Sequence, residues 1–307
     1  MFPPSTLGPT LWGPNLALMS QPALTIASLL QDPRLQQACG QWLTGGRYEL
    51  VELGDQSDPV AVLEARRDGF DAVLIEQGAL AGDAYQHLIR QGLLLPAVVV
   101  GAVSGRQEYH DAEVHLPPDQ LEQLTYSLDA AVSRVLRRGL SGSGANGDGD
   151  PAVPASGWTL TNRLKERLGY LGVFYKRDPS RFLRNLPAQD RRDLLQSLER
   201  TYRDLLISYF RDPAAANQAL ESFVHTAFFT DLPITKAVEI HMNLIDDFWK
   251  QLKLESQSNT FLQDYRLALL DVMAHLCEMY RRSVPAETPL LTKRRDAQPA
   301  MAVQEVS

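Results

Sequence analysis

One segment, Gly139 to Gly157, divides the chain into two parts with different sequence patterns. It reads GLSGSGANGDGDPAVPASG and offers almost nothing that a core could bury, which is typical of a flexible linker. The chain has 307 residues, 44% of them hydrophobic, which is enough for two ordinary domains. We expect a disordered leader, a first domain, the linker, a second domain and a disordered tail over residues 1–22, 23–138, 139–158, 159–285 and 286–307.

In the first part, short runs rich in β-branched residues alternate with helical patterns. The runs at Ala72 to Ile75 and Ala97 to Val100 are bounded by polar or glycine-containing stretches, as expected for strands buried on both faces of a parallel sheet. Similar runs occur over 24–29 and 48–53, with helical patterns over 33–43 and 60–67 between them. This alternation predicts a doubly wound, flavodoxin-like α/β domain.

The second part is almost free of glycine and has helical periodicity throughout. Asp212 before Pro213 is a helix start signal, because the carboxylate can cap the helix and proline needs no donor in the first turn. The last helix carries an apolar seam at steps of three and four that is typical of a bundle or a dimer. The seam residues are Leu262, Tyr265, Leu269, Val272, Leu276 and Met279. Helices are predicted over 159–176, 188–210, 213–229, 233–254 and 259–282.

Charge and composition exclude several classes of protein. The net charge of −7 disfavours a general nucleic-acid binder, which needs a basic surface for phosphates. Residues 159–285 carry a net charge of +2, so this half is the better surface for an acidic or neutral peptide. The longest apolar run, Leu93 to Val103, is too short for a membrane span, and only two cysteines occur. We expect a soluble cytoplasmic protein.

The first domain resembles response-regulator receivers in pattern but lacks their chemistry. In FDAVLIEQG, Glu76 stands where receivers carry the phosphoacceptor aspartate. Receivers also hold Mg²⁺ with an acidic pair and the phosphoryl group with a hydroxyl and a lysine. Here Asp32 is the only acid near the metal position, while Gly101 and Leu116 replace the hydroxyl and the lysine. We therefore expect a pseudo-receiver in which Glu76 is a solvated carboxylate, the alternative being a mimic of the phosphorylated state.

No pattern in the chain indicates an enzyme or a metal site. There is no glycine-rich phosphate loop and no nucleophile with an adjacent base. His87, His110 and His115 do not follow metal-ligand spacings. The sequence predicts neither catalytic residues nor bound metal.

Polar stripes run beside the apolar faces of the last two helices. Asp271, His275 and Glu278 follow helical steps with Asp264, and Glu239 and Asp246 form a similar stripe with Asn243 and Lys250. Considered alone, such stripes are ordinary solvated helix faces. In the earlier helix we expect most of the following side chains to be buried: Ile234, Val238, His241, Leu244, Ile245, Phe248 and Trp249.

Three segments resemble the signature blocks of the KaiA family of cyanobacterial circadian clock proteins. They are ERLGYLGVFYKRDPSRFLRNLP, AFFTDLPITKAVEIHMNLIDDF and DYRLALLDVMAHLCEMYRRSVP, which begin at residues 166, 227 and 264. The resemblance implies a four-helix-bundle domain that dimerises, binds the C-terminal tail of the kinase KaiC and promotes KaiC autophosphorylation. It also implies that KaiB, when bound to KaiC, sequesters the same protein.

The resemblance also directs the choice of site residues. It places the dimer groove and the kinase contact around Asp271, His275, Cys277 and Glu278, to which we add Glu239, Met242, Asp246, Tyr170 and Phe229. Tyr170 and Phe229 could equally pack in the core, and His241 and Met242 are expected in core or interface packing.

The family resemblance implies that the N-terminal domain modulates the effector, through contacts with the helices or with a redox-active quinone. No residue in this sequence marks a quinone site, so no cofactor is predicted. The alternative function is a divergent two-component response regulator that acts through its receiver-like domain.

Overall fold

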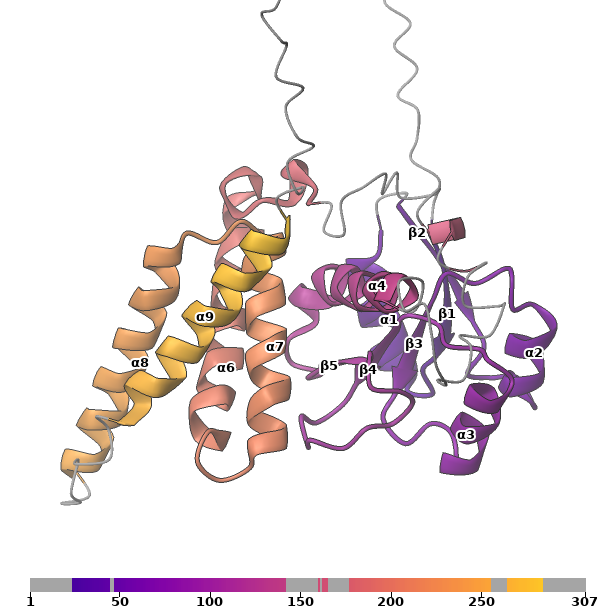
Figure 1. Cartoon of the computed structure of the whole chain (residues 1–307), viewed down its shortest axis with the longest axis horizontal. Coiled ribbons are helices and arrows are strands. Elements are labelled where there is room, and N and C mark those ends of the chain that lie inside the picture. Colours follow the sequence, from indigo (N-terminus) through magenta and orange to yellow (C-terminus); the bar gives the residue numbers. More distant parts are fainter. Residues whose placement is uncertain are drawn as a thin grey trace, which may run out of the picture.

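A sheet of five parallel strands and a group of long helices lie side by side in the molecule (Figure 1). The structure is a computed structural model that describes residues 24–44, 47–141, 160, 162–164, 177–254 and 264–283. The predicted leader, most of the linker, most of the helix expected over 159–176 and the tail lie outside these residues. Within the described part of the chain, no helix combines the length and apolar character needed to cross a membrane.

The sheet has the strand order β2-β1-β3-β4-β5, and every pairing is parallel. This order is the doubly wound arrangement that the alternating pattern predicts. The central strands are almost entirely buried because helices cover both faces. The strands are β1 (Leu24–Leu29), β2 (Tyr48–Glu52), β3 (Ala72–Glu76), β4 (Ala97–Val100) and β5 (Val114–Leu116).

Helices α1 (Pro33–Trp42), α2 (Pro59–Ala65), α3 (Gly82–Arg90) and α4 (Leu124–Ser141) accompany this sheet. Asp32 and Asp58 cap the first two helices by accepting backbone N–H bonds ahead of a proline. A short 3₁₀ turn, η1 (Leu121–Gln123), precedes α4. The chain between β4 and β5 forms a loop without a helix, over residues 101–113.

The helical region contains α6 (Ala188–Ser208), α7 (Pro213–Phe229), α8 (Ile234–Leu254) and α9 (Arg266–Ser283), preceded by the 3₁₀ turns η2 (Pro179–Arg181) and η3 (Leu183–Asn185). Asp212 accepts hydrogen bonds from the amides of Ala214 and Ala215, which confirms the predicted start of α7. Most side chains of α7 are buried, since this helix lies between α6 and α9 on one side and α4 and β5 on the other.

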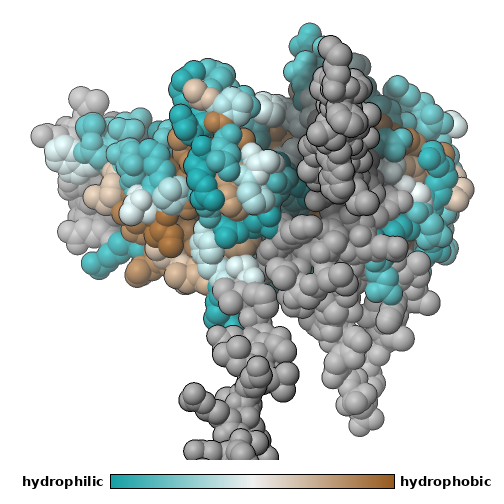
Figure 2. All heavy atoms as spheres, turned by 90° about the horizontal axis from the view of Figure 1, so that it is seen from above, coloured by the Kyte–Doolittle hydropathy of each residue, from teal (hydrophilic) through white to brown (hydrophobic). Residues whose placement is uncertain are grey.

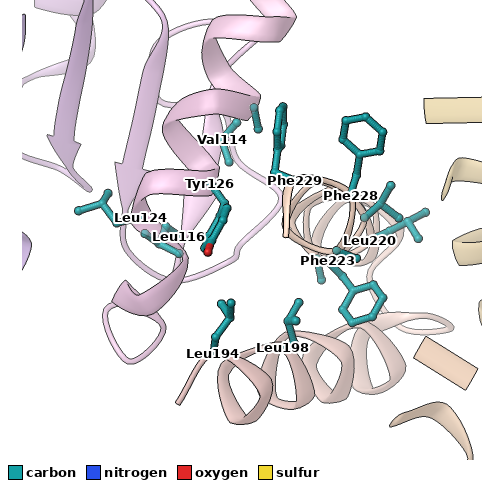
Figure 3. Close-up of a cluster of buried hydrophobic side chains, with 14 of the residues drawn as sticks. Val114, Leu116, Leu124, Tyr126, Leu194, Leu198, Leu220, Phe223, Phe228 and Phe229 are labelled. Carbon is teal, nitrogen blue, oxygen red and sulfur yellow. The ribbon is translucent and has the colours of Figure 1, made fainter. Parts of the chain in front are cut away.

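One hydrophobic core joins the sheet to the helical region. Figure 3 shows Val114, Leu116 and Leu124 facing the side chains of α6 and α7, with Leu194, Leu198 and Phe223 among them. A second core fills the opposite face of the sheet beneath α2 and α3, around Phe70 and Tyr85. The receiver-like region and the helices therefore share buried surface.

The expectation that most of seven named α8 side chains are buried does not hold at the two ends of the set. Ile234 and Trp249 are 41% and 39% exposed. They lie near the two ends of α8, whereas the packed stripe consists of Ala237, Ile240, His241 and Leu244 in between. On α9, the predicted seam is confirmed for Val272, Leu276 and Met279, which are buried, while Leu262 lies outside the described residues.

Candidate functional site

Large apolar side chains remain exposed on the helical region. Leu270 on α9 and Met242 on α8 are 61% and 58% exposed. Figure 2 shows hydrophobic residues gathered at the helical end of the molecule. Extended apolar surface on a soluble protein commonly marks a place where another molecule packs. We call the following set the exposed apolar residues: Ile207, Phe210, Met242, Trp249, Leu267 and Leu270.

The α9 candidates Asp271, His275, Cys277 and Glu278 all lie on the solvent side of this helix. Leu267, Leu270, Ala274 and Cys277 are exposed at steps of three and four, so the polar candidates border an apolar stripe. The Nδ1 of His275 contacts the backbone oxygen of Asp271 at 2.8 Å, and the Asp271 carboxylate accepts a hydrogen bond from Tyr209. The free Cys277 is exposed as well.

Glu278 is held in its charged form by its neighbours on α9. Its carboxylate accepts hydrogen bonds from Arg281 at 2.6 and 2.7 Å and also pairs with Arg282. These contacts lower the pKa of Glu278 to about 2. The negative charge of Glu278 is therefore already paired, and a binding partner would have to compete with Arg281 and Arg282 for the carboxylate.

The α8 candidates also project into solvent. Glu239 pairs with Lys236 at 2.7 Å, and Asp246 pairs with Lys250 at 2.6 Å. Met242 lies between these two carboxylates on the same face, at steps of three and four. This face offers an apolar thioether flanked by two negative charges.

A groove runs between α6 and α8 and includes Asp246. Its volume is about 560 Å³, with Ile240 and Leu244 among its apolar lining residues. The charged residues of its rim have both signs: Glu199, Arg200, Arg203, Asp246, Asp247 and Lys250. A groove that combines these two apolar residues with charged residues of both signs suits an extended peptide that carries both apolar and charged side chains.

One of the remaining candidates is not at this surface. Phe229 is 1% exposed and packs edge-to-face on Phe228, with ring centroids 5.3 Å apart, so core packing is the correct alternative for it. Tyr170 lies outside the described residues. His241 is buried, as expected, with its Nδ1 3.1 Å from the Tyr202 hydroxyl, and burial lowers its pKa. Within the described residues, no group of three or more His, Cys, Asp or Glu could hold a metal ion.

Glu76, which stands where receivers carry the phosphoacceptor aspartate, is hydrogen-bonded to the protein's own backbone. One carboxylate oxygen of Glu76 accepts hydrogen bonds from the backbone N–H groups of Gln31 and Asp32, at 2.6 and 2.9 Å. The Asp32 carboxylate is engaged as the cap of α1. Glu76 is therefore neither a free solvated carboxylate nor poised for phosphotransfer, because it fixes the loop that would carry the metal ligands of a receiver.

Sequence reasoning missed the polar groups that join the two regions. Gln123 donates to Ser197 and Thr201 at 2.8 and 2.7 Å and accepts from Thr226 at 2.8 Å, and all four side chains are buried. We call these four residues the glutamine anchor. The sequence carries no signal for it, because glutamine, serine and threonine are usually exposed and their burial depends on tertiary packing.

Two family models match the chain over most of the described residues. The model described as "Circadian clock protein KaiA, N-terminal domain" matches residues 24–139, and "KaiA C-terminal domain" matches residues 166–287. The order of the two matches agrees with that of the sheet domain and the helical region.

Individual relatives agree with these matches. A circadian clock oscillator protein KaiA from Parasynechococcus marenigrum is 58% identical over 278 residues, covering 89% of this chain and 93% of that protein. The KaiA of Synechococcus elongatus is 42% identical over 288 residues, covering 88% of this chain and 100% of that protein. A crystal structure of the C-terminal domain of KaiA from Thermosynechococcus elongatus BP-1 is 51% identical and covers 33% of this chain and 93% of that chain, with a TM-score of 0.30. The chain belongs to the KaiA family of circadian clock oscillator proteins.

Proposed function

We propose that the protein is a non-enzymatic clock regulator that binds the C-terminal segment of the kinase KaiC and stimulates KaiC autophosphorylation. It acts in the cytoplasm as a homodimer formed through its helical region, and KaiB bound to KaiC antagonises it. Family membership supports the place in the clock. The observation that carries the proposal is the apolar stripe on α9, which runs beside His275 and is left exposed by the described part of the chain.

Dimerisation is supported by the chemistry of the exposed apolar residues. Leu267 and Leu270 on α9 are 46% and 61% exposed, and burying a leucine side chain stabilises an interface by about 1.5 to 3 kcal/mol. A second copy would present the same stripe, and a twofold interface is self-complementary. The polar residues at the border, including His275 and Glu278, would then line the edge of the dimer.

Peptide binding is supported by the groove between α6 and α8. Asp246 and Asp247 can pair with basic residues of an incoming tail, and Arg200 and Arg203 with acidic ones. A regulator that binds the released kinase tail favours the kinase conformation with that tail released, by its difference in affinity for the two states. No bond is made or broken by the regulator itself.

The test is KaiC autophosphorylation with purified proteins. Wild-type protein is expected to raise the phosphate content of KaiC, and His275→Ala to lower this stimulation severalfold. His87→Ala, which removes a partly exposed histidine that lies on the distant helix α3 and pairs with Glu64, serves as the control and should stimulate like the wild type. The proposal is wrong if the wild type leaves KaiC phosphorylation unchanged, or if His275→Ala and His87→Ala behave alike.

Dimerisation has its own test by sedimentation. The wild type should sediment as a dimer and Leu270→Asp as a monomer, since a carboxylate would have to be buried in the interface. Ala61→Asp places the same charge on an exposed position of α2 and should leave the dimer intact. A monomeric wild type would contradict the proposed assembly.

A further inference from the structure

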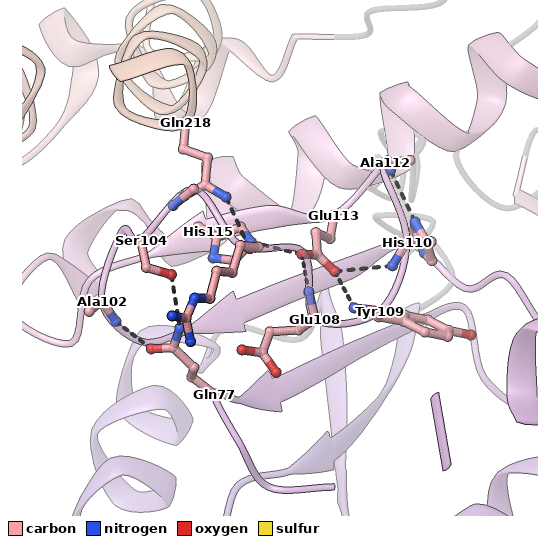
Figure 4. Close-up of polar contacts among 12 residues, drawn as sticks. Gln77, Ala102, Ser104, Glu108, Tyr109, His110, Ala112, Glu113, His115 and Gln218 are labelled. Carbon is pink, nitrogen blue, oxygen red and sulfur yellow. Dashed lines mark hydrogen bonds and ion pairs between the residues drawn. The ribbon is translucent and has the colours of Figure 1, made fainter. Parts of the chain in front are cut away.

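The loop over residues 101–113 is held in place by side chains rather than by secondary structure. The backbone N–H of Ala102 donates to Gln77 at 2.9 Å, and that of Gly105 donates to Gln218 at 2.9 Å. The buried Glu113 carboxylate accepts from the N–H groups of residues 108, 109 and 110 at 2.7 to 3.1 Å. Figure 4 shows these contacts along the loop. The conformation of the loop therefore depends on β3, on α7 and on its own end.

The contact with α7 is close and two-sided. While the Gln218 side-chain oxygen accepts from Gly105, its nitrogen donates to the backbone oxygen of Arg106 at 3.3 Å. Gly105 has a φ of +70°, and a Cβ built on it would lie 2.5 Å from the Cβ of Ala214. Only glycine combines this backbone conformation with this approach to the first turn of α7.

The contact with β3 starts at the residue after the lost phosphoacceptor. Gln77 directly follows Glu76, and its side chain holds the N–H of Ala102 and lies 3.5 Å from the Ser104 hydroxyl. A Cβ on Gly101 would lie 2.4 Å from that of Gln77. The carboxyl end of β3 is thus joined to α7 through residues 102–105, a short chain of direct contacts.

The two ends of the contact between the sheet and the helical region are built differently. The glutamine anchor is buried, with each of its members hydrogen-bonded. Near Gly105 and Gln218, in contrast, there is a hollow of about 210 Å³. At its walls His115 Nδ1 and Ser222 Oγ are buried and have no hydrogen-bond partner among the described residues. A buried polar cluster that is only partly satisfied is less stable than a satisfied one, so we expect this end to open before the glutamine anchor.

We propose that residues 102–106 form a releasable latch between the carboxyl edge of the sheet and the first turns of α7. In the latched state Gln77 and Gln218 hold the loop from opposite sides. A molecule that binds at this edge and draws Gln77 away would free Gly105 and loosen α7, while the glutamine anchor keeps the two regions together. The coupling is reciprocal, so a change in α7 would also loosen the loop.

Hydrogen exchange of the full chain tests the latch without any partner. Gln77→Ala is expected to speed exchange roughly tenfold both at Gly105 and in residues 213–219 of α7, while residues 121–126 keep the wild-type rate. Gln218→Ala should affect the same two segments. Because both variants open one latch, the double variant should exchange no faster than the faster single variant.

Matched surface variants serve as controls. Gln86→Ala on α3 and Asn217→Ala beside Gln218 replace exposed side chains and should leave all of these rates unchanged. The proposal is overturned if Gln77→Ala changes the loop but not α7, if the effects of the two variants add independently, or if residues 121–126 exchange as fast as the loop. An equal acceleration everywhere would indicate global destabilisation and would also overturn it. The outcome is independent of KaiC binding, so failure here leaves the proposed function standing.

Discussion

Single buried charges join the sheet region to the helical region. Asp129 on α4 is 3% exposed and pairs with Arg47 at 3.1 Å and with Arg181. Arg181 also lies over the Tyr126 ring, 5.2 Å from its centroid. Burial lowers the pKa of Arg181, and the Asp129 carboxylate offsets the cost of burying the guanidinium. This cluster ties β2 and α4 of the sheet region to the residues just before α6.

Removing the Asp129 carboxylate should be severely destabilising. Asp129→Ala leaves Arg47 and Arg181 with only the more exposed Asp178 as a shared partner, and we expect a loss of roughly 3 kcal/mol in the free energy of unfolding. Urea denaturation measures this loss. Asp55→Ala removes an exposed carboxylate from a loop and should change stability by less than about 0.5 kcal/mol. Equal losses in the two variants would show that the buried cluster contributes nothing.

His225 on α7 should make the fold sensitive to acid. Burial and the nearby Arg134 lower the pKa of His225 to about 3. In the unfolded chain this imidazole binds a proton near pH 6.5, so its contribution to the free energy of unfolding is fully present above that pH. As the pH decreases from about 6 to 3, the free energy of unfolding falls by roughly 1.4 kcal/mol per pH unit. His225→Asn cannot titrate, and its urea midpoints should fall less steeply on acidification. A slope identical to that of the wild type would rule out this source of acid sensitivity.

At the scale of elements, the sequence predicted most helices and strands because their patterns are local. The alternation of β-branched runs, the helix start at Asp212 and Pro213, and the described part of the seam on α9, with Val272, Leu276 and Met279 buried, are confirmed. Exposure near the ends of α8 could not be predicted, because it depends on how far neighbouring helices extend. The bonds from the Glu76 carboxylate to the loop after β1 were equally hidden, since they join positions far apart in sequence.

The candidate site was predictable only in part. Helical spacing placed Asp271, His275 and Glu278 on one exposed face, where the structure has them. Periodicity alone could not tell that Phe229 is in the core, because α7 is buried on nearly every side. The latch residues Gln77 and Gln218 carry no signal in one sequence, since a glutamine is informative only when its partners are known.

Because the loop over residues 101–113 lies close to α7, substitutions at a glycine of this loop and at one outside it should lower the stability by different amounts. Gly78 and Gly105 both have positive φ, but a Cβ on Gly78 would meet nothing within 4 Å. Gly78→Ala should lower the free energy of unfolding only by the backbone cost of roughly 1 to 2 kcal/mol. Gly105→Ala should lose about 1 to 3 kcal/mol more, because the new methyl group overlaps Ala214. Matching urea midpoints for the two variants would contradict the close contact with α7.

At the scale of the whole molecule, the sheet domain and the helical region share a core. Val114, Leu116 and Leu124 of the first region pack in one cluster with Leu194 and Leu198 of the second (Figure 3). The glutamine anchor and the Asp129 cluster add polar contacts across the same surface. Loss of either region would therefore expose apolar side chains of the other.

This shared core predicts a single cooperative unfolding transition for the full chain. Far-ultraviolet circular dichroism and hydrogen exchange at β4 and α8 should give the same urea midpoint, because neither region retains its core when the other unfolds. Gln123→Ala removes the centre of the glutamine anchor and should lower the midpoint while keeping one transition. Two separate transitions in the wild type would show that the regions fold independently.

The central claim is that the helical region receives the tail of KaiC, and a peptide titration tests it most directly. A labelled peptide of the KaiC C-terminal segment is titrated with the full-length protein, and fluorescence anisotropy records binding. We predict saturable binding that His275→Ala and a double Asp246→Ala, Asp247→Ala variant each weaken at least severalfold, with His87→Ala unchanged. Absence of binding by the wild type, or equal affinity in all of these variants, would contradict the account.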